Sequence, residues 1–374
     1  MSIMNSERIK FLVISSAYPY RGGISDSTHS FCNELVDSGE SIEVWTFSLL
    51  YPSFLFPGNT QYSRERYEQK FQIKRKINTI NPFNWLAVSK KINKLSPEVV
   101  ILRYWSPILC LPYYFISFFL SKKIRVIGIV DNWKNHEKIP FENILRKLFL
   151  KSCSKFISFS ENIAEMIRFN TKKEVLSLYH PINTNLPIFK EKAKAKNDLN
   201  LKDYKYVTFV GLIRKYKGVQ TFIKSINYIK DDNIKFIIAG EFYDSLNEYK
   251  QLVNELNLSE KILIDNNFLE LDRIRDYICA SELIVQPYIN ASQSGITPLA
   301  YFYNKPLVVS KVRGLKEIIN KDQSGEVFDK TPENLAKAIL NCIDEKRNQL
   351  YVSNIIQAKN YYTWSTFVKK IKTI

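Results

Sequence analysis

Short apolar runs alternate with helical patterns along this chain, and this alternation constrains the fold more than any other feature. The first half carries strand-like runs such as IKFLVISS (9–16), SIEVWTF (41–47), EVVILRYW (98–105) and KIRVIGIVDN (123–132). Segments with the apolar spacing of amphipathic helices lie between these runs, for example around HSFCNELVDSG (29–39). Strands that alternate with helices predict βαβ units around a parallel sheet.

The same pattern restarts after a polar, lysine-rich connector at 179–204. The second half carries KYVTFVGLI (205–213), IKFIIAGEF (234–242), KILIDN (261–266), ELIVQPY (282–288) and PLVVS (306–310), each followed by a helical pattern. A chain of 374 residues is also long enough for two cores. We therefore predict an α/β protein with two Rossmann-like domains, at 1–185 and 186–355, whose strands end at a shared ligand-binding cleft.

The formal net charge of +17 predicts attraction to an anionic partner. Nucleic acid, a membrane surface and phosphorylated substrates are the three classes that fit. Nucleic-acid recognition would require a concentrated basic stripe or a known motif, and neither is present, because basic residues are shared between both halves. We expect no nucleic-acid partner.

Two features predict a cytoplasmic location. The five cysteines are far apart and form no CxxC pair, which argues against a disulfide framework or a zinc site. The most apolar window, 106–123, contains Pro107 and Pro112 and is shorter than the ~20 residues that span a bilayer. We expect a buried or interfacial helix there, and the apolar run near the N-terminus is too short for a signal peptide.

The segment VGLIRKYKGVQTF (210–222) is the strongest candidate for a phosphate site. Gly211 ends a strand, Arg214 and Lys217 follow, and Gly218 opens a helix. Fixed cations stabilise the negative charge that grows on a departing diphosphate. A solvated charged loop is the alternative interpretation.

Glycines and one acidic residue mark two further strand ends. Gly22 and Gly23 lie between the first strand and the first helix, where the backbone can approach an anionic ligand; a tight turn is the alternative. Glu241 follows Gly240 at another strand end, where it would line the cleft or cap a loop.

Asp131 and His136 follow a strand of the first domain in IVDNWKNHEKIPF (129–141). A carboxylate or an imidazole at that position would orient or deprotonate an acceptor hydroxyl. Loop capping by Asp131, and a structural histidine, are the alternatives.

The segment NASQSGITPLAYFYNKPLVVS (290–310) has small residues before an apolar helix and contains no carboxylate. No DxD sequence and no clustered metal ligands occur in the chain, so we expect no metal ion and no cofactor. No phosphate-binding P-loop and no GxSxG nucleophile elbow occurs either.

Taken in order, these segments resemble the family-4 retaining glycosyltransferases of the GT-B fold. The resemblance extends over nearly the whole chain, and its specificity lies in the order and spacing of the pieces. The matching segments are SAYPYRGG, VDNWKNHEK, YHPIN, FVGLIRKYKG, IAGEF, VQPYINASQSG and KPLVVSKVRGLKEII.

The resemblance implies transfer of a sugar from a nucleotide sugar to an acceptor hydroxyl, with retention at the anomeric carbon and without a metal. The donor would bind mainly to the second domain and the acceptor to the first, across the cleft of the GT-B fold. The last helix, at 356–374, would cross back to the first domain. Lys217 and the neighbourhood of Gly211 would bind the diphosphate, with Arg214 replacing the arginine that the family carries where this chain has Leu212.

The chain departs from the family in the 290–310 segment. Family members usually carry two glutamates eight residues apart, and the corresponding residues here are Ala291 and Leu299. The loop looks like a variant of bacterial surface-polysaccharide enzymes that reads A-[ST]-Q-S-G. In that variant the donor sugar or phosphate would be held by neutral side chains and backbone amides of Ser292, Gln293, Ser294, Gly295 and Ile296.

We therefore expect a hexosyltransferase that adds a sugar to a lipid-linked or polysaccharide acceptor in lipopolysaccharide, capsule or O-antigen synthesis. The basic segment 64–78 and the aromatic segment 104–120 would dock peripherally on an anionic inner leaflet; solvated charge is the alternative. Two other functions stay open: a degenerate GT-B domain that only binds, and a GT-B enzyme that epimerises or hydrolyses nucleotide sugars.

Overall fold

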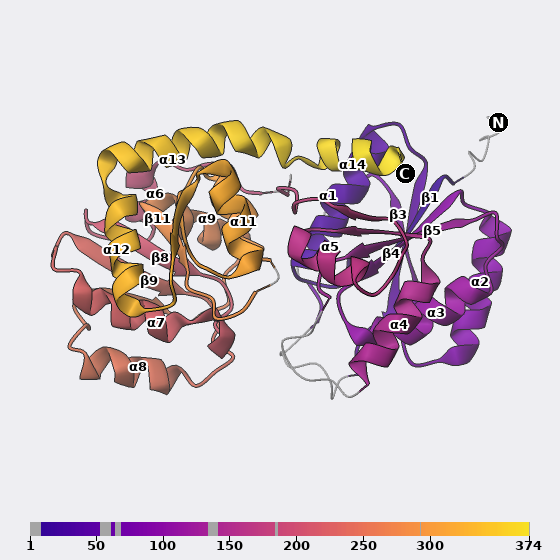
Figure 1. Ribbon diagram of the computed structural model, residues 1–374, viewed down its shortest axis with the longest axis horizontal. Coiled ribbons are helices and arrows are strands. Elements are labelled where there is room, and N and C mark those ends of the chain that lie inside the picture. The colour runs from indigo at the N-terminus through magenta and orange to yellow at the C-terminus, as the bar shows by residue number, and fades with distance from the viewer. Residues whose placement is uncertain are drawn as a thin grey trace. The chain divides into compact units, whose positions relative to one another are not determined.

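The chain forms two units, each built around its own parallel sheet (Figure 1). The structure is a computed structural model and describes residues 9–52, 61–63, 69–133, 141–183, 186–291 and 293–373. Unit 1 comprises Met1–Asn183 together with Trp364–Ile374, and unit 2 comprises Thr184–Thr363. The predicted α/β fold with two Rossmann-like domains is confirmed.

Unit 1 has a seven-stranded parallel sheet in the order β3-β2-β1-β4-β5-β6-β7. Its strands are β1 Phe11–Ile14, β2 Ile42–Leu49, β3 Gln72–Asn78, β4 Val99–Tyr104, β5 Arg125–Val130, β6 Lys155–Ser158 and β7 Val175–Ser177. Its helices are α1 Gly23–Asp37, α2 Pro82–Leu95, α3 Cys110–Phe118, α4 Glu142–Ser152, α5 Glu161–Arg168 and α14 Trp364–Lys372, with a short 3₁₀ turn at Pro107–Leu109.

Alternate residues of the central strands face two separate cores of unit 1, as the period of a β-strand requires. On β4, Val100 and Leu102 face the core that α2, α3, α4 and α5 cover, and Ile101 faces the core that α1 and α14 cover. Both faces of the sheet are therefore buried, which explains why its strands read as continuous apolar runs.

Unit 2 has a six-stranded parallel sheet in the order β10-β9-β8-β11-β12-β13. Its strands are β8 Lys205–Val210, β9 Ile234–Ala239, β10 Ile262–Asp265, β11 Leu283–Gln286, β12 Leu307–Ser310 and β13 Gly325–Phe328. Its helices are α6 Lys192–Asp198, α7 Val219–Ser225, α8 Leu246–Glu255, α9 Leu271–Ala280, α10 Ile296–Phe302, α11 Arg313–Asp322, α12 Pro332–Ile343 and α13 Glu345–Ala358, with 3₁₀ turns at Lys215–Lys217, Ile226–Tyr228 and Lys359–Tyr361.

The strand order reverses between β8 and β11 in unit 2, because the chain fills one half of the sheet before it crosses to the other. In open α/β sheets, ligands bind outside the carboxyl ends of the strands at such a switch point. The loops that follow β8 and β11 are therefore where a ligand of unit 2 is expected.

The C-terminal segment differs from the single helix expected at 356–374. Helix α13 ends at Ala358, and α14 begins only at Trp364. Tyr362 lies between them with a non-helical backbone, and its hydroxyl donates to Asp322 Oδ2 over 2.7 Å in unit 2. Trp364 is buried in unit 1, where its ring contacts Phe31 with a centroid distance of 5.8 Å. The break separates a residue anchored in one unit from a residue anchored in the other.

Within the described residues, none of the helices is both long and apolar enough to cross a membrane. The same residues contain no group of three or more histidine, cysteine or acidic side chains placed to hold a metal ion.

Candidate functional site

The end of β8 can only be built from glycine. Gly211 has a φ of 122°, a conformation that side chains rarely adopt. A Cβ atom on Gly211 would lie 3.4 Å from Ile296 Cδ1 and 3.6 Å from Lys217 Nζ. The side chain of Lys217 and the start of α10 therefore meet directly over the end of β8.

Gly240, at the end of β9, holds the neighbouring strand end in place. Its φ is 143°, and a Cβ atom there would lie 2.2 Å from the carbonyl oxygen of Gly211. Glu241 is the next residue, and its backbone carbonyl oxygen accepts the N–H of Ile213 over 2.9 Å. Its Oε2 atom is buried without a hydrogen-bond partner among the described residues, which is costly unless a ligand or water supplies a donor.

Lys217 is the first of two cations at the site. Its ammonium lies 5.2 Å from the centre of the Tyr288 ring, and the residue as a whole is only partly exposed. Burial lowers the pKa of Lys217 below that of an ordinary lysine, and the charge of Arg214 lowers it further. A partly desolvated ammonium interacts more strongly with an anion than a solvated one, because the effective dielectric is lower.

The cation loop is fixed to the loop after β11. Gly218 has a φ of 66°, and a Cβ atom there would lie 2.0 Å from the carbonyl oxygen of Pro287. The N–H of Ile289 donates to the carbonyl oxygen of Tyr216 over 2.7 Å. The two loops at the switch point therefore form one structure.

Arg214 lies in the same loop, with its guanidinium 4.7 Å from the centre of the Tyr243 ring. Lys215 follows Arg214 directly in the chain and is exposed. The predicted pair of cations, Arg214 and Lys217, is thus held against aromatic rings of two different loops, whereas Lys215 points to solvent.

The loop after β11 has its own polar support. Tyr288 Oη lies 3.2 Å from Ser294 Oγ, which accepts the N–H of Ile296 over 3.2 Å. Burial raises the pKa of Tyr288 to about 12, so its hydroxyl keeps its proton at neutral pH. Gly295 is exposed at the start of α10, and Gln293 is partly exposed. Ser292 lies outside the described residues.

Sequence reasoning missed Tyr243 and Tyr288, which contact the two cations. Both tyrosines follow a strand end by a few residues; Tyr288 ends the apolar run 282–288, and Tyr243 comes directly after the run 234–242. Their position one to three residues after a glycine or proline that follows a strand is the signal that could have identified them.

In unit 1, Gly22 and Gly23 begin α1. Gly22 has a φ of 107°, which requires glycine, and its carbonyl oxygen accepts the N–H of Asp26 over 3.1 Å. A Cβ atom on either glycine would meet nothing within 4 Å. The turn therefore needs Gly22 for its backbone conformation, while the space above both residues is open.

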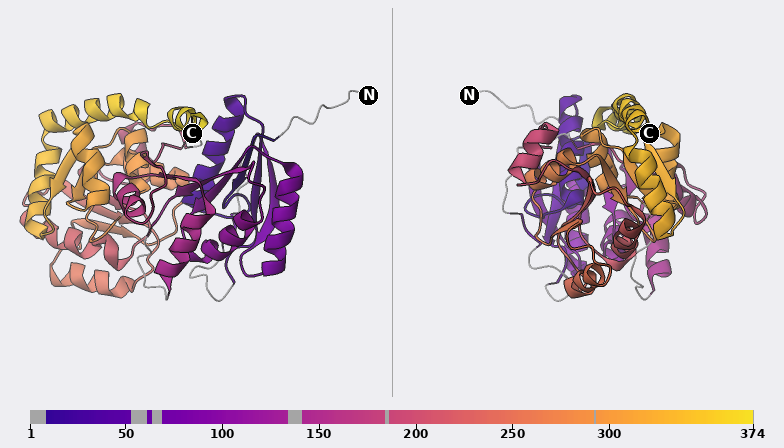
Figure 2. Two further views of the ribbon diagram at one scale, coloured as in Figure 1. Left: turned by 45° about the vertical axis from the view of Figure 1, so that its right-hand side comes forward. Right: turned by 90° about the vertical axis from the view of Figure 1, so that its left-hand side faces the viewer.

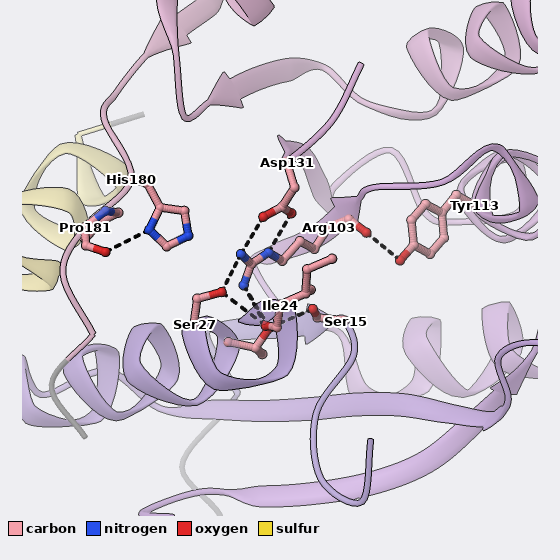
Figure 3. Close-up of polar contacts among 9 residues, drawn as sticks. Ser15, Ile24, Ser27, Arg103, Tyr113, Asp131, His180 and Pro181 are labelled. Carbon is pink, nitrogen blue, oxygen red and sulfur yellow. Dashed lines mark hydrogen bonds and ion pairs between the residues drawn. The ribbon is translucent and has the colours of Figure 1, made fainter. Parts of the chain in front are cut away.

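Asp131 lies in a buried ion pair, and this geometry argues against the role expected for it. The Asp131 carboxylate is 3% exposed and accepts from Arg103 Nε over 2.8 Å and from Nη2 over 2.6 Å (Figure 3). Both oxygens of this carboxylate accept from the same guanidinium, and a buried ion pair of this kind is typical of a structural role. His136 lies outside the described residues.

The guanidinium of Arg103 connects β4, β5 and α1. It donates to Ser27 Oγ over 2.6 Å, to Thr28 Oγ1 over 2.9 Å and to the carbonyl oxygen of Ile24 over 3.1 Å, in addition to its pair with Asp131 (Figure 3). Every donor direction of the fork is used within unit 1. This cluster therefore positions the start of α1 against the sheet.

The site has the parts expected of a domain that binds a nucleotide diphosphate: glycine-ended strands at a switch point and two fixed cations. Comparison with known proteins finds a related family and shared folds. Residues 190–360, most of unit 2, match the family of glycosyl transferases group 1. An uncharacterised glycosyltransferase, MJ1607, of Methanocaldococcus jannaschii is 26% identical over 233 residues, which is 59% of this chain and 59% of that protein's length.

Solved glycosyltransferase structures share the fold over nearly the whole chain. Sucrose-phosphate synthase of Thermosynechococcus elongatus has a TM-score of 0.75 at 15% identity, with 97% of this chain and 98% of that chain covered. Anabaena Alr3699/HepE in complex with UDP has a TM-score of 0.74 at 15% identity, with the same coverage. The apo form of the lipopolysaccharide outer core galactosyltransferase WaaB has a TM-score of 0.68 at 14% identity, with 97% and 99% covered.

The fold is therefore that of the GT-B glycosyltransferases, and most of unit 2 matches the group 1 glycosyl transferase family.

Proposed function

We propose that this protein is a retaining hexosyltransferase that takes its sugar from a nucleoside diphosphate sugar and needs no metal ion. The observation that carries the proposal is the position of Lys217. Its ammonium lies over the glycine that ends β8, beside the first residue of α10, and its partner cation Arg214 lies in the same loop. The solved structure of Alr3699/HepE with UDP-glucose makes a uridine donor the first to be assayed.

In this mechanism the acceptor oxygen bonds to the anomeric carbon on the face from which the diphosphate leaves, so the anomeric configuration is kept. The bond from the sugar to the diphosphate breaks, and the leaving diphosphate takes the proton of the acceptor hydroxyl. Lys217 and Arg214 stabilise the charge that develops on the leaving diphosphate, the role that a metal ion has in other enzymes. The backbone and side chains of 293–296 hold the donor sugar or phosphate. The acceptor is a lipid-linked or polysaccharide glycan, a suggestion supported by the likeness to WaaB.

The first test is isothermal titration of the purified protein with UDP, ADP, GDP and CDP, in EDTA and then in Mg²⁺. We expect one nucleotide to bind equally well in both conditions. The substitution Lys217→Ala should weaken that binding at least tenfold and lower turnover of the matching nucleotide sugar by about a hundredfold, the usual effect of losing one transition-state donor.

Lys215→Ala is the matched control, because it removes an exposed lysine of the same loop without touching Gly211 or Tyr288. It should bind nucleotide within about twofold of the wild type, since solvated charges contribute little. Equal effects of both substitutions would remove Lys217 from the mechanism. No binding of any nucleotide would replace the proposal with a degenerate domain. A nucleotide sugar that is hydrolysed or epimerised equally with and without acceptor would show a different reaction.

A further inference from the structure

Two neighbouring helices of unit 1 expose a large apolar surface, which we name the α2–α3 face. Its most exposed members are Phe83, with 86% of its surface accessible, and Phe118, with 66%. Single exposed apolar side chains are ordinary, but several together mark an interaction site. The apolar side chains of the face are Ile80, Phe83, Leu86, Leu111, Phe115, Phe118 and Phe119.

The apolar character of α3 continues all round the helix. Its inner side buries Tyr113 and Ile116 in the core of unit 1. Its outer side carries Leu111, Phe115 and Phe118, which lie at i, i+4 and i+7 and therefore on one stripe. A helix at the surface of a water-soluble domain normally places polar residues on this side. The outer stripe thus needs an occupant other than water.

The two helices form one continuous surface. The rings of Trp85 on α2 and Phe115 on α3 are stacked, with centroids 5.5 Å apart. Asn93 of α2 donates its Nδ2 to the carbonyl oxygen of Phe119 over 2.8 Å, and its Oδ1 accepts the N–H of Ser121 over 2.8 Å. Both helices lie side by side in the views of Figure 1 and Figure 2.

The charged residues within the two helices and their flanking turns have one sign. The face is bordered by exposed lysines of α2 and of the turn after α3, and segments 79–97 and 99–124 contain no acidic residue. Asn93 brings the two groups of lysines together, because it ties the last turn of α2 to the end of α3. The lysines are Lys90, Lys91, Lys94, Lys122 and Lys123.

We propose that the α2–α3 face docks on a membrane surface that contains anionic lipid. Aromatic side chains enter the boundary between headgroups and acyl chains, and the lysines bind the lipid phosphates. A second copy of the chain fits less well, because a two-fold contact would bring the lysines of both copies together. Part of the basic segment first expected to dock, 64–68, lies outside the described residues, and Gln72–Asn78 forms strand β3.

The test is flotation of the full chain with vesicles of phosphatidylcholine alone and of phosphatidylcholine with about 30% phosphatidylglycerol, at low and high salt. We expect binding to the anionic vesicles, weakened by salt. Lys122→Gln with Lys123→Gln should weaken it roughly 25-fold, about fivefold for each lysine. Phe83→Ser with Phe118→Ser should weaken it about tenfold or more, since each removes apolar area from the contact.

Matched controls are Phe169→Ser, at a residue that is 92% exposed beyond α5, and Lys337→Gln with Lys346→Gln in unit 2. Both controls should bind as the wild type does. Circular dichroism of each variant checks that the fold is kept, and no donor or acceptor is required, so the outcome is independent of the proposed reaction.

Three outcomes would overturn the proposal. The first is no binding of the wild type to anionic vesicles, and the second is binding that the face variants and the controls lower equally. The third is a dimer in solution that Phe83→Ser with Phe118→Ser dissociates, while neither the dimer nor the dissociated variant binds vesicles. The last outcome would assign the face to a second copy of the chain.

Discussion

Arg103 and Asp131 show how a buried contact can argue against a role that the sequence alone suggests. Asp131 follows a strand in a loop of candidate acceptor residues, so a catalytic role was a reasonable expectation. Its partner Arg103 is on the neighbouring strand, and both side chains are nearly inaccessible. Pairing between strands brings them together, and the sequence pattern carries no sign of that pairing.

If Asp131 is structural, Asp131→Asn should lower the free energy of unfolding by about 3 kcal/mol, because it leaves the guanidinium of Arg103 buried without its counter-charge. Arg103→Met together with Asp131→Leu should be less destabilised than Asp131→Asn, since no charge stays buried. The measurement is urea unfolding, with nucleotide titration of the folded variant beside it. A stable Asp131→Asn protein with lost turnover would restore the catalytic assignment.

A second residue gives unit 1 a pH dependence. His29 is fully buried on α1, its Nε2 accepts the N–H of Tyr18 over 3.1 Å, and burial lowers the pKa of His29 to about 4. The unfolded chain takes up a proton on this ring near pH 6.5, whereas the folded protein does so only near pH 4. Stability from His29 is therefore complete above pH 6.5 and is lost as the pH falls toward 4.

His29→Gln keeps a side chain that can accept a hydrogen bond but removes the ionisable group. We expect the wild type to lose about 2 kcal/mol more than His29→Gln when the free energy of unfolding is measured at pH 7 and again at pH 5. Carboxylates contribute equally to both proteins, so the difference isolates this histidine. Parallel losses in the two proteins would mean that His29 is not buried in its neutral form.

At the scale of elements, the sequence predicted the central strands well because they are buried on both faces, whereas the largely exposed edge strand β3 was taken for part of a basic docking segment. Strands buried on both faces read as continuous apolar runs, and the helices between them are regular. Glycine at strand ends was informative for a related reason: Gly211 and Gly240 have backbone conformations and close contacts that exclude other residues. The cation loop was therefore identifiable from Gly211, Arg214 and Lys217.

The remaining parts of the site depend on contacts between elements far apart in sequence. The contact of Lys217 with Tyr288 joins two loops that meet only because β8 and β11 are neighbours in the sheet. The break between α13 and α14 could not be placed for the same reason, since no glycine or proline marks it and the anchoring partner of Tyr362 is on α11. Helical periodicity alone continues through that segment.

At the scale of the whole molecule, unit 1 is completed by a helix that follows unit 2 in the chain. All five tryptophans, at positions 45, 85, 105, 133 and 364, belong to unit 1, so tryptophan fluorescence reports the unfolding of that unit. Trp364 is 1% exposed, whereas the nearby aromatic residue Tyr361 is 74% exposed. Substitution of Tyr361 is therefore a control for substitution of Trp364.

Trp364→Ala should lower the stability of unit 1 by about 3–5 kcal/mol, the usual cost of removing a large buried side chain. Tyr361→Ala should change it by less than about 0.5 kcal/mol. Urea unfolding followed by the fluorescence of the other four tryptophans, with nucleotide titration as the report from unit 2, measures both. If the two variants unfold at the same urea concentration, α14 contributes little to the stability of unit 1.

The position of α14 also bears on how the protein is made. A ribosome synthesises the sheet of unit 1 first, but Phe31 and Phe367 cannot meet until the whole of Thr184–Thr363 has followed. Unit 2 is continuous in the chain, so all of its core residues are present as soon as its own last residue has been synthesised. The nascent chain therefore carries an incomplete first unit, with an uncovered aromatic face, throughout the synthesis of the second, and this interval is when a chaperone would be most useful.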